Sequence, residues 1–221
     1  MTHLIPLESY KDFDKILELA QICNNEMSHI NWDDIKADLL SQPKDVVPSI
    51  SVRWMEHIAN VDVGEVGYRD NNRELELCVP EMPEEVGSWF YISLKDGYQM
   101  RTDHKPYINA AFKNTMEYIS ALPKAVHVSI NIFSPHMISP DHTDGFPDYN
   151  SILLTFKTSK NNPENVMASI DGEEFIFKDR EFFVFDPEIP HSGVNKSDDD
   201  WCFLIIRIDK SEFNQNENII T

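Results

Sequence analysis

The chain has 221 residues, 41% of them hydrophobic and 11% aromatic, and its 38 acidic against 19 basic residues give a formal net charge of −19. This length is sufficient for one large domain with a substantial core. The acidic balance excludes nucleic acid or an anionic membrane as the main partner, because phosphate groups are bound by clustered Lys and Arg side chains.

The N-terminal part is predicted to be helical and then irregular. Apolar residues recur at helical spacing between about Ser9 and Ser28, with Ser9 as a plausible cap. A shorter helix is expected after Asn31, ending before Pro43, where Asp residues favour its positive end. Residues 55–85 mix short apolar runs with acidic stretches and turn signals, which indicates irregular structure or short strands.

The pattern changes near Trp89. Residues 89–94 are rich in β-forming side chains and are followed by the turn sequence Lys95-Asp96-Gly97. Pro106 is a suitable first residue for a helix that reaches Ala121. From Val126 onward, short strands follow one another at residues 126–133, 151–158, 166–170, 174–177, 182–185 and 201–208.

Many short strands at regular spacing are typical of a sandwich or jelly-roll. We therefore predict a mainly β fold with N-terminal helices in a single domain over residues 1–221. Within it, residues 1–88 form a helical or irregular layer, 89–209 the jelly-roll core, and 210–221 a tail.

The three cysteines, Cys23, Cys78 and Cys202, are far apart and form no CxxC pair. This pattern favours reduced structural thiols over a disulfide framework or a zinc site. Residues 1–7 lack a basic region followed by an apolar run, and no apolar stretch approaches 18 residues. We expect a soluble cytoplasmic protein without a membrane span.

His142 and Asp144 form the most informative motif. They flank one residue, so on an extended segment their side chains point to the same side. His191 follows the predicted strand 182–185 and a Pro-rich turn, and the corresponding regions of a jelly-roll lie close together. Two imidazoles and one carboxylate on one side of an ion form the facial triad of non-haem Fe(II) oxygenases. Ligand type alone also admits manganese or nickel, whereas zinc usually prefers a closed tetrahedral site or a catalytic water.

The remaining histidines are weaker candidates. His136 lies in the turn before the motif and is interpreted as a supporting or structural residue. The others have no partner pattern and are interpreted as incidental: His3, His57, His104 and His127.

Residues 131–145 (NIFSPHMISPDHTDG) resemble the strand, turn and metal motif of the aspartyl/asparaginyl β-hydroxylase-like group, which belongs to the Fe(II)- and 2-oxoglutarate-dependent dioxygenases. Residues 182–186 (FFVFD) and 190–195 (PHSGVN) resemble the family's later strand, histidine and Asn segment. The resemblance covers about residues 89–209. It implies a double-stranded β-helix fold, Fe(II) held by His142, Asp144 and His191, 2-oxoglutarate as co-substrate, and O2.

A 2-oxoglutarate co-substrate requires a basic partner for its distal carboxylate, best supplied by a guanidinium. Arg207 in the last strand is the candidate, with Lys157 as runner-up and Asn131 and Thr155 as further contacts. The sequence departs from the family here. Many members carry an arginine on the strand that corresponds to residues 151–155, and a second near positions 201–202, and this chain has neither.

The resemblance implies hydroxylation of an unactivated carbon with release of succinate and CO2. The intact carboxylate Asp144 favours hydroxylation over halogenation. The expected substrate is a free amino acid, a small peptide or a related metabolite, and the residues select neither one substrate nor an oligomeric state. Aromatic residues are candidates for the pocket mouth (Trp89, Tyr91, Phe146, Tyr149), and three arginines for a substrate carboxylate (Arg53, Arg101, Arg180).

Two other functions stay open at this point. One is a cupin-type metal enzyme that does not use 2-oxoglutarate, although cupins usually recruit three histidines. The other is a catalytically silent jelly-roll that acts as a binding module.

Overall fold

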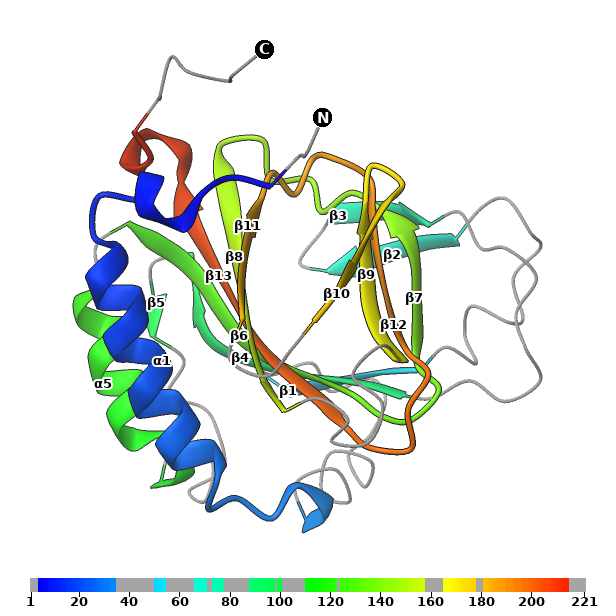
Figure 1. The fold of residues 1–221 in the computed structure, drawn as a ribbon, viewed down its shortest axis with the longest axis horizontal. Helices are drawn as coiled ribbons and strands as arrows, with labels where there is room; N and C mark the ends of the chain where they lie inside the picture. The colour runs from blue at the N-terminus through cyan, green and yellow to red at the C-terminus, as the bar shows by residue number, and fades with distance from the viewer. Residues whose placement is uncertain are drawn as a thin grey trace.

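Two antiparallel β-sheets face each other in this chain (Figure 1). The computed structural model describes residues 4–34, 50–54, 66–70, 73–77, 88–97, 99–100, 110–122, 124–157, 165–177 and 181–214. The larger sheet has the order β1 (Ile50–Trp54), β4 (Ser88–Asp96), β6 (Ala125–Phe133), β13 (Trp201–Asp209), β8 (Tyr149–Lys157) and β11 (Phe182–Phe185), and β5 (Gln99–Met100) pairs with β4. The smaller sheet has the order β10 (Glu173–Ile176), β9 (Val166–Ile170), β12 (His191–Asn195) and β7 (Ile138–His142). β2 (Val66–Asp70) and β3 (Arg73–Leu77) form a separate two-stranded sheet.

From β6 onward the chain passes back and forth between the two sheets. β6, β8, β11 and β13 belong to the larger sheet, while β7, the β9–β10 hairpin and β12 lie between them in sequence and belong to the smaller one. This alternation is the topology of a double-stranded β-helix. The predicted fold class, mainly β with N-terminal helices, is confirmed.

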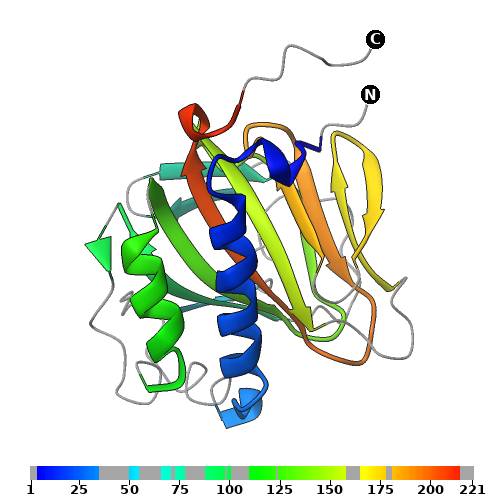
Figure 2. The same cartoon turned by 60° about the vertical axis from the view of Figure 1, so that its left-hand side comes forward.

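Two helices cover the outer face of the larger sheet (Figure 2). α1 (Phe13–Met27) buries Ile16, Leu19 and Cys23, and α5 (Lys113–Ala121) lies beside it. The Glu26 carboxylate of α1 accepts hydrogen bonds from backbone N–H groups at the start of α5, at 2.7 and 2.9 Å. This contact joins the two helices and satisfies donors that would otherwise have no partner.

The predicted helix boundaries were partly right. α1 begins four residues later than expected, because Leu7–Ser9 form a short 3₁₀ helix and Tyr10 then bridges to Phe213 near the other end of the chain. A second 3₁₀ helix, Lys210–Glu212, follows β13. Most of the helix predicted after Asn31, and the predicted helical residues 106–109, lie outside the described residues.

Most predicted strands are present within two residues of the expected bounds. No strand is predicted at β12 from the sequence, because His191–Asn195 contains Ser and Gly and lacks apolar alternation. β1 was also missed.

The two faces of β6 show where the sheets place their side chains. Val128, Ile130 and Ile132 belong to the apolar cluster shared with the helices. The alternate residues His127, Ser129 and Asn131 are also buried and belong to the opposite face, which faces the smaller sheet. The space between the sheets therefore carries a polar strip.

A cluster of aromatic residues closes this space around the start of β13. Trp201 is 1% exposed, and its ring centroid lies 5.2 Å from Phe133, 5.1 Å from Phe177 and 4.5 Å from Phe203. Gly193 of β12 faces this cluster, and a Cβ there would come within 3.1 Å of the Phe133 ring. We call the four residues Trp201, Phe133, Phe177 and Phe203 the aromatic floor.

Cys23 and Cys202 are free and buried, and Cys78 lies outside the described residues. None of the helices in the described ranges combines the length and apolar character that a membrane crossing requires.

The Cys23 thiol is expected to resist alkylation in the folded protein. Burial raises its pKa to about 12, so at pH 8 it is ionised roughly a thousandfold less than a free thiol of ordinary pKa about 8.5. Iodoacetamide treatment followed by peptide mass spectrometry should leave Cys23 unmodified in buffer and modified in urea. Rapid labelling in buffer would contradict the packing of α1 against the sheet.

Candidate metal centre

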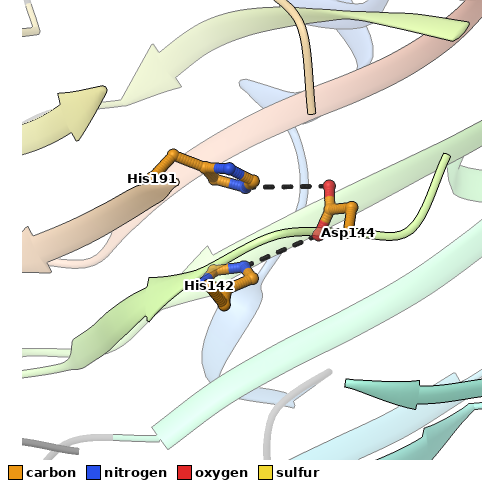
Figure 3. A group of neighbouring side chains, drawn as sticks. All are labelled: His142, Asp144 and His191. Atoms are coloured by element: carbon orange, nitrogen blue, oxygen red, sulfur yellow. Dashed lines mark ion pairs between the residues drawn. The ribbon is translucent and has the colours of Figure 1, made fainter. Parts of the chain in front are cut away.

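His142, Asp144 and His191 lie together between the two sheets (Figure 3). His142 is the last residue of β7, Asp144 follows in the next loop, and His191 is the first residue of β12. One ligand atom from each residue lies within 4.8 Å of the others. The structure thus brings together the three residues that the sequence motif singled out.

The two histidines face each other because β7 and β12 pair antiparallel with His191 opposite His142. Their ring centroids are 4.4 Å apart. The register shifts between this pair and the next one, Gly193 opposite Ser139, so β7 contains one residue more than β12 in this interval. Pro140 lies in the interval and has no N–H to donate, which suits a bulge.

The orientation of His191 is set by its backbone surroundings. Its Nδ1 lies 2.9 Å from the Ile189 carbonyl oxygen, which can only accept, so Nδ1 carries the proton and Nε2 is left with its lone pair. Burial lowers the pKa of His191, and this keeps the ring neutral near pH 7. A neutral imidazole with a free Nε2 is the form that binds a metal ion.

Asp144 is held by the loop that follows β7. Its backbone N–H donates to the Pro187 carbonyl at 2.9 Å, and Gly145 then adopts φ +70°, a conformation that favours glycine. The Glu188 carboxylate accepts from the Phe146 N–H at 2.5 Å. These contacts tie the loop to the turn that precedes His191.

The charge of Asp144 is maintained by its neighbours. Burial alone would raise its pKa, but the Arg207 guanidinium, His191 and His142 together hold the pKa well below its usual range. Its Oδ1 lies 3.6 Å from His142 Nε2, and its Oδ2 lies 3.7 Å from His191 Nε2 and 2.6 Å from Arg207 Nη2. The site therefore offers two ring nitrogens and an ionised carboxylate oxygen.

Arg207 lies beside the centre within a row of polar residues that crosses four strands. It pairs with His127 of β6 on one side and with Ser151 of β8 on the other, and His127 pairs with Asp96 of β4. Arg207 is buried, its Nε has no hydrogen-bond partner in the structure, and neither has the buried Ser151 Oγ. Two unpartnered donors on adjacent strands are suited to an anion such as a carboxylate.

The other predicted co-substrate residues do not lie in this row. Asn131 and Thr155 flank Phe203, four residues and about 13 Å along the strand from Arg207. The Asn131 amide contacts Trp89 and Ser129, and Thr155 Oγ1 accepts from the Glu181 N–H at 3.2 Å. Lys157 pairs with Cys202 through the backbone, and its side chain lies outside the described part.

The aromatic candidates for the mouth separate into two groups. Phe146 stacks over the Arg207 guanidinium at 4.0 Å, with Tyr149 beside it at 6.4 Å. Trp89 instead packs on Phe133 at 5.2 Å, next to the aromatic floor. The side chains of Tyr91 and Arg53, and Arg101 and Arg180 altogether, lie outside the described residues.

Sequence reasoning missed two residues. Ser151 was noted only as a position where an arginine was absent, and His127 was interpreted as incidental although it is buried beside Arg207. The alternation of polar and apolar residues in 126–132 was the available signal, but it does not reveal that the polar face is enclosed. His136 is exposed, with 55% of its side chain accessible, and lies 3.7 Å from Asp198.

The donor set is suited to a divalent transition metal. Neutral imidazoles and one carboxylate on one side of an ion fit Fe(II), and the residues that would hold it are His142, Asp144 and His191. The unpartnered Arg207 Nε and Ser151 Oγ fit a carboxylate-bearing co-substrate next to the metal.

A sequence model of the family described as Aspartyl/Asparaginyl beta-hydroxylase matches residues 30–211, more than half of the chain. No curated protein sequence matches it.

Solved cupin structures are similar to this chain at low identity. A predicted oxalate decarboxylase from Thermotoga maritima is 16% identical with a TM-score of 0.37, and the match covers 61% of this chain and 91% of that one. An RmlC-like cupin from Desulfovibrio desulfuricans is 11% identical with a TM-score of 0.32, covering 39% and 74%. The Schizosaccharomyces pombe Cnp3 cupin domain is 7% identical with a TM-score of 0.34, covering 41% of this chain and 60% of that domain. At these values the matches carry no argument about function.

Proposed function

This chain belongs to the aspartyl/asparaginyl β-hydroxylase family, and we propose from that premise that it is an Fe(II)- and 2-oxoglutarate-dependent hydroxylase of an amino acid, a small peptide or a related metabolite. The observation that carries the proposal is the His–Asp–His group, in which His142 is buried and the other two residues are half-buried, with an unpartnered guanidinium nitrogen beside it. When bound, Fe(II) and 2-oxoglutarate supply the oxidising chemistry, in which O2 is consumed, succinate and CO2 are released and a substrate carbon is hydroxylated.

The chain's own residues would bind, orient and exclude water. His142, Asp144 and His191 present their ligand atoms to one side, which leaves positions for small molecules on the other. Arg207 and Ser151 bind the distal carboxylate of 2-oxoglutarate in place of the two arginines that many relatives carry. The start of β13, where one of those arginines would lie, is filled by the aromatic floor.

Phe146 and the loop around it cover Arg207 from the outside. The ring contacts the guanidinium at 4.0 Å, and the loop is fixed by Glu188 and Pro187. This arrangement keeps water away from a charged group whose attraction for a carboxylate is stronger in a dry environment. The protein therefore contributes a shielded and oriented anion site next to the metal.

We expect Fe(II) and 2-oxoglutarate, added together without oxygen, to give a weak visible charge-transfer band, and air to convert 2-oxoglutarate into succinate. Succinate release across the proteinogenic amino acids would then identify the substrate as the compound that stimulates it. Iron binding without the band or succinate would favour the cupin-type enzyme. Failure to bind iron would leave the catalytically silent module.

A further inference from the structure

We propose that Arg207 is a positioning residue for the metal centre, which holds one oxygen of Asp144 so that only the other is presented to the metal. The inference rests on the proposed metal site and goes beyond the role of Arg207 toward a co-substrate. Arg207 Nη2 lies 2.6 Å from Asp144 Oδ2, and the two side chains are 11% and 13% exposed. A charge-assisted hydrogen bond at this distance, shielded from water, is among the strong contacts in a protein.

The two oxygens of Asp144 have different surroundings. Oδ1 faces His142 Nε2 at 3.6 Å, whereas Oδ2 accepts the hydrogen bond from Arg207 Nη2 and faces His191 Nε2 at 3.7 Å. A metal ion bound to the two histidines therefore meets Oδ1 as the free oxygen. Coordination through a single carboxylate oxygen keeps the three remaining positions of a facial site open.

Arg207 is itself held in place. Its backbone pairs with β6 and β8 on both sides, and the Phe146 ring covers its guanidinium at 4.0 Å. The Nη2 atom contacts Asp144 while Nε has no hydrogen-bond partner in the structure. The Arg207 guanidinium can therefore donate to Asp144 through Nη2 and to a bound anion through Nε.

The effect of removing Arg207 has two opposing contributions. A cation near a metal ion repels it, and this would make the metal bind more tightly once Arg207 is gone. However, the charge of Arg207 is already compensated by Asp144, and without Arg207 this carboxylate is free to rotate away from the histidines. Because residues that orient a ligand typically contribute ten- to a hundredfold in metal affinity, we expect weaker binding.

The test is calorimetric titration with Co(II) alone, without 2-oxoglutarate, which separates this role from co-substrate binding. Arg207→Gln should weaken Co(II) binding by about ten- to a hundredfold and change the visible Co(II) spectrum, because the orientation of the Asp144 carboxylate toward the metal is then no longer fixed. Arg207→Lys, which keeps the charge and one donor, should recover part of the affinity. The matched control is Lys210→Gln, which removes a different cation, three residues along the chain and paired with Asp186. This variant should bind Co(II) with an affinity within about twofold of the wild type.

Unchanged or tighter Co(II) binding by Arg207→Gln, with an unchanged spectrum, would overturn the inference and leave the proposed function standing. If the wild-type protein bound no Co(II), both would fall. Circular dichroism shows whether Arg207→Gln folds. If it does not, Arg207→Lys is compared directly with the wild type. Wild-type Co(II) affinity and spectrum in Arg207→Lys would support the role of the cation in holding Asp144, and tighter Co(II) binding would exclude it.

Discussion

Replacing His191 with alanine is expected to abolish both metal binding and succinate formation. His191 presents a neutral Nε2 toward Asp144 because its Nδ1 is committed to the Ile189 carbonyl. Among the described residues, only His142 and Asp144 join His191 in this group of ligand atoms, and both already supply one atom each. Losing a residue that only hydrogen-bonds to a metal ligand costs up to about a hundredfold in metal affinity. Losing the ligand His191 itself should therefore lower the affinity for Co(II) or Fe(II) by more than that.

His136 provides the matched control for this experiment. It lies on the segment before the motif, is largely exposed, and has φ +63°, a backbone conformation that asparagine tolerates. His136→Asn should therefore bind metal and release succinate like the wild type. Equal losses in the two variants, or full turnover by His191→Ala, would contradict the assignment of His191 as a ligand.

Replacing Trp201 with alanine is expected to lower the free energy of unfolding by about 3–5 kcal/mol, the usual cost of removing a buried aromatic side chain. Trp201 is the largest fully buried side chain among the described residues, and its ring contacts Phe133, Phe177 and Phe203. The neighbouring rings come from β6, from β13 itself and from the end of the β9–β10 hairpin, so they cannot close the cavity without moving the sheets. The melting temperature should fall by roughly 6–20 °C.

Urea unfolding followed by circular dichroism measures this change directly. Ile176→Ala is the control, because Ile176 lies on β10 and is 49% exposed. Its loss should change stability by less than about 0.5 kcal/mol. A Trp201→Ala protein as stable as this control would show that the aromatic floor is not closely packed.

The sequence was sufficient to predict the fold class and to single out the three residues of the centre. Two short, mainly apolar strands, residues 166–170 and 182–185, are predicted with the bounds that they have. The grouping of His142, Asp144 and His191 can be predicted from two simple rules. Side chains alternate along an extended chain, and consecutive strands of a jelly-roll meet at its ends.

The neighbours of the centre could not be predicted in the same way. Asn131 and Thr155 are polar residues on predicted strands, but their distance from Arg207 depends on how β6, β13 and β8 are aligned. That alignment also places Ser151 next to Arg207, although 56 residues separate them in sequence. Register between distant strands is set by the packing of the whole sheet, and no short motif records it.

The bulge in β7 has a consequence for how chains of this kind can diverge. If the present sequence continued in regular pairing from Gly193–Ser139, with no bulge, Asp141 instead of His142 would lie opposite His191. A deletion of one codon in this interval would instead make the strand regular and leave His142 opposite His191, because each strand would then have one residue between the two pairs. The strand before the motif can therefore be one residue shorter without a change in the residue that lies opposite His191.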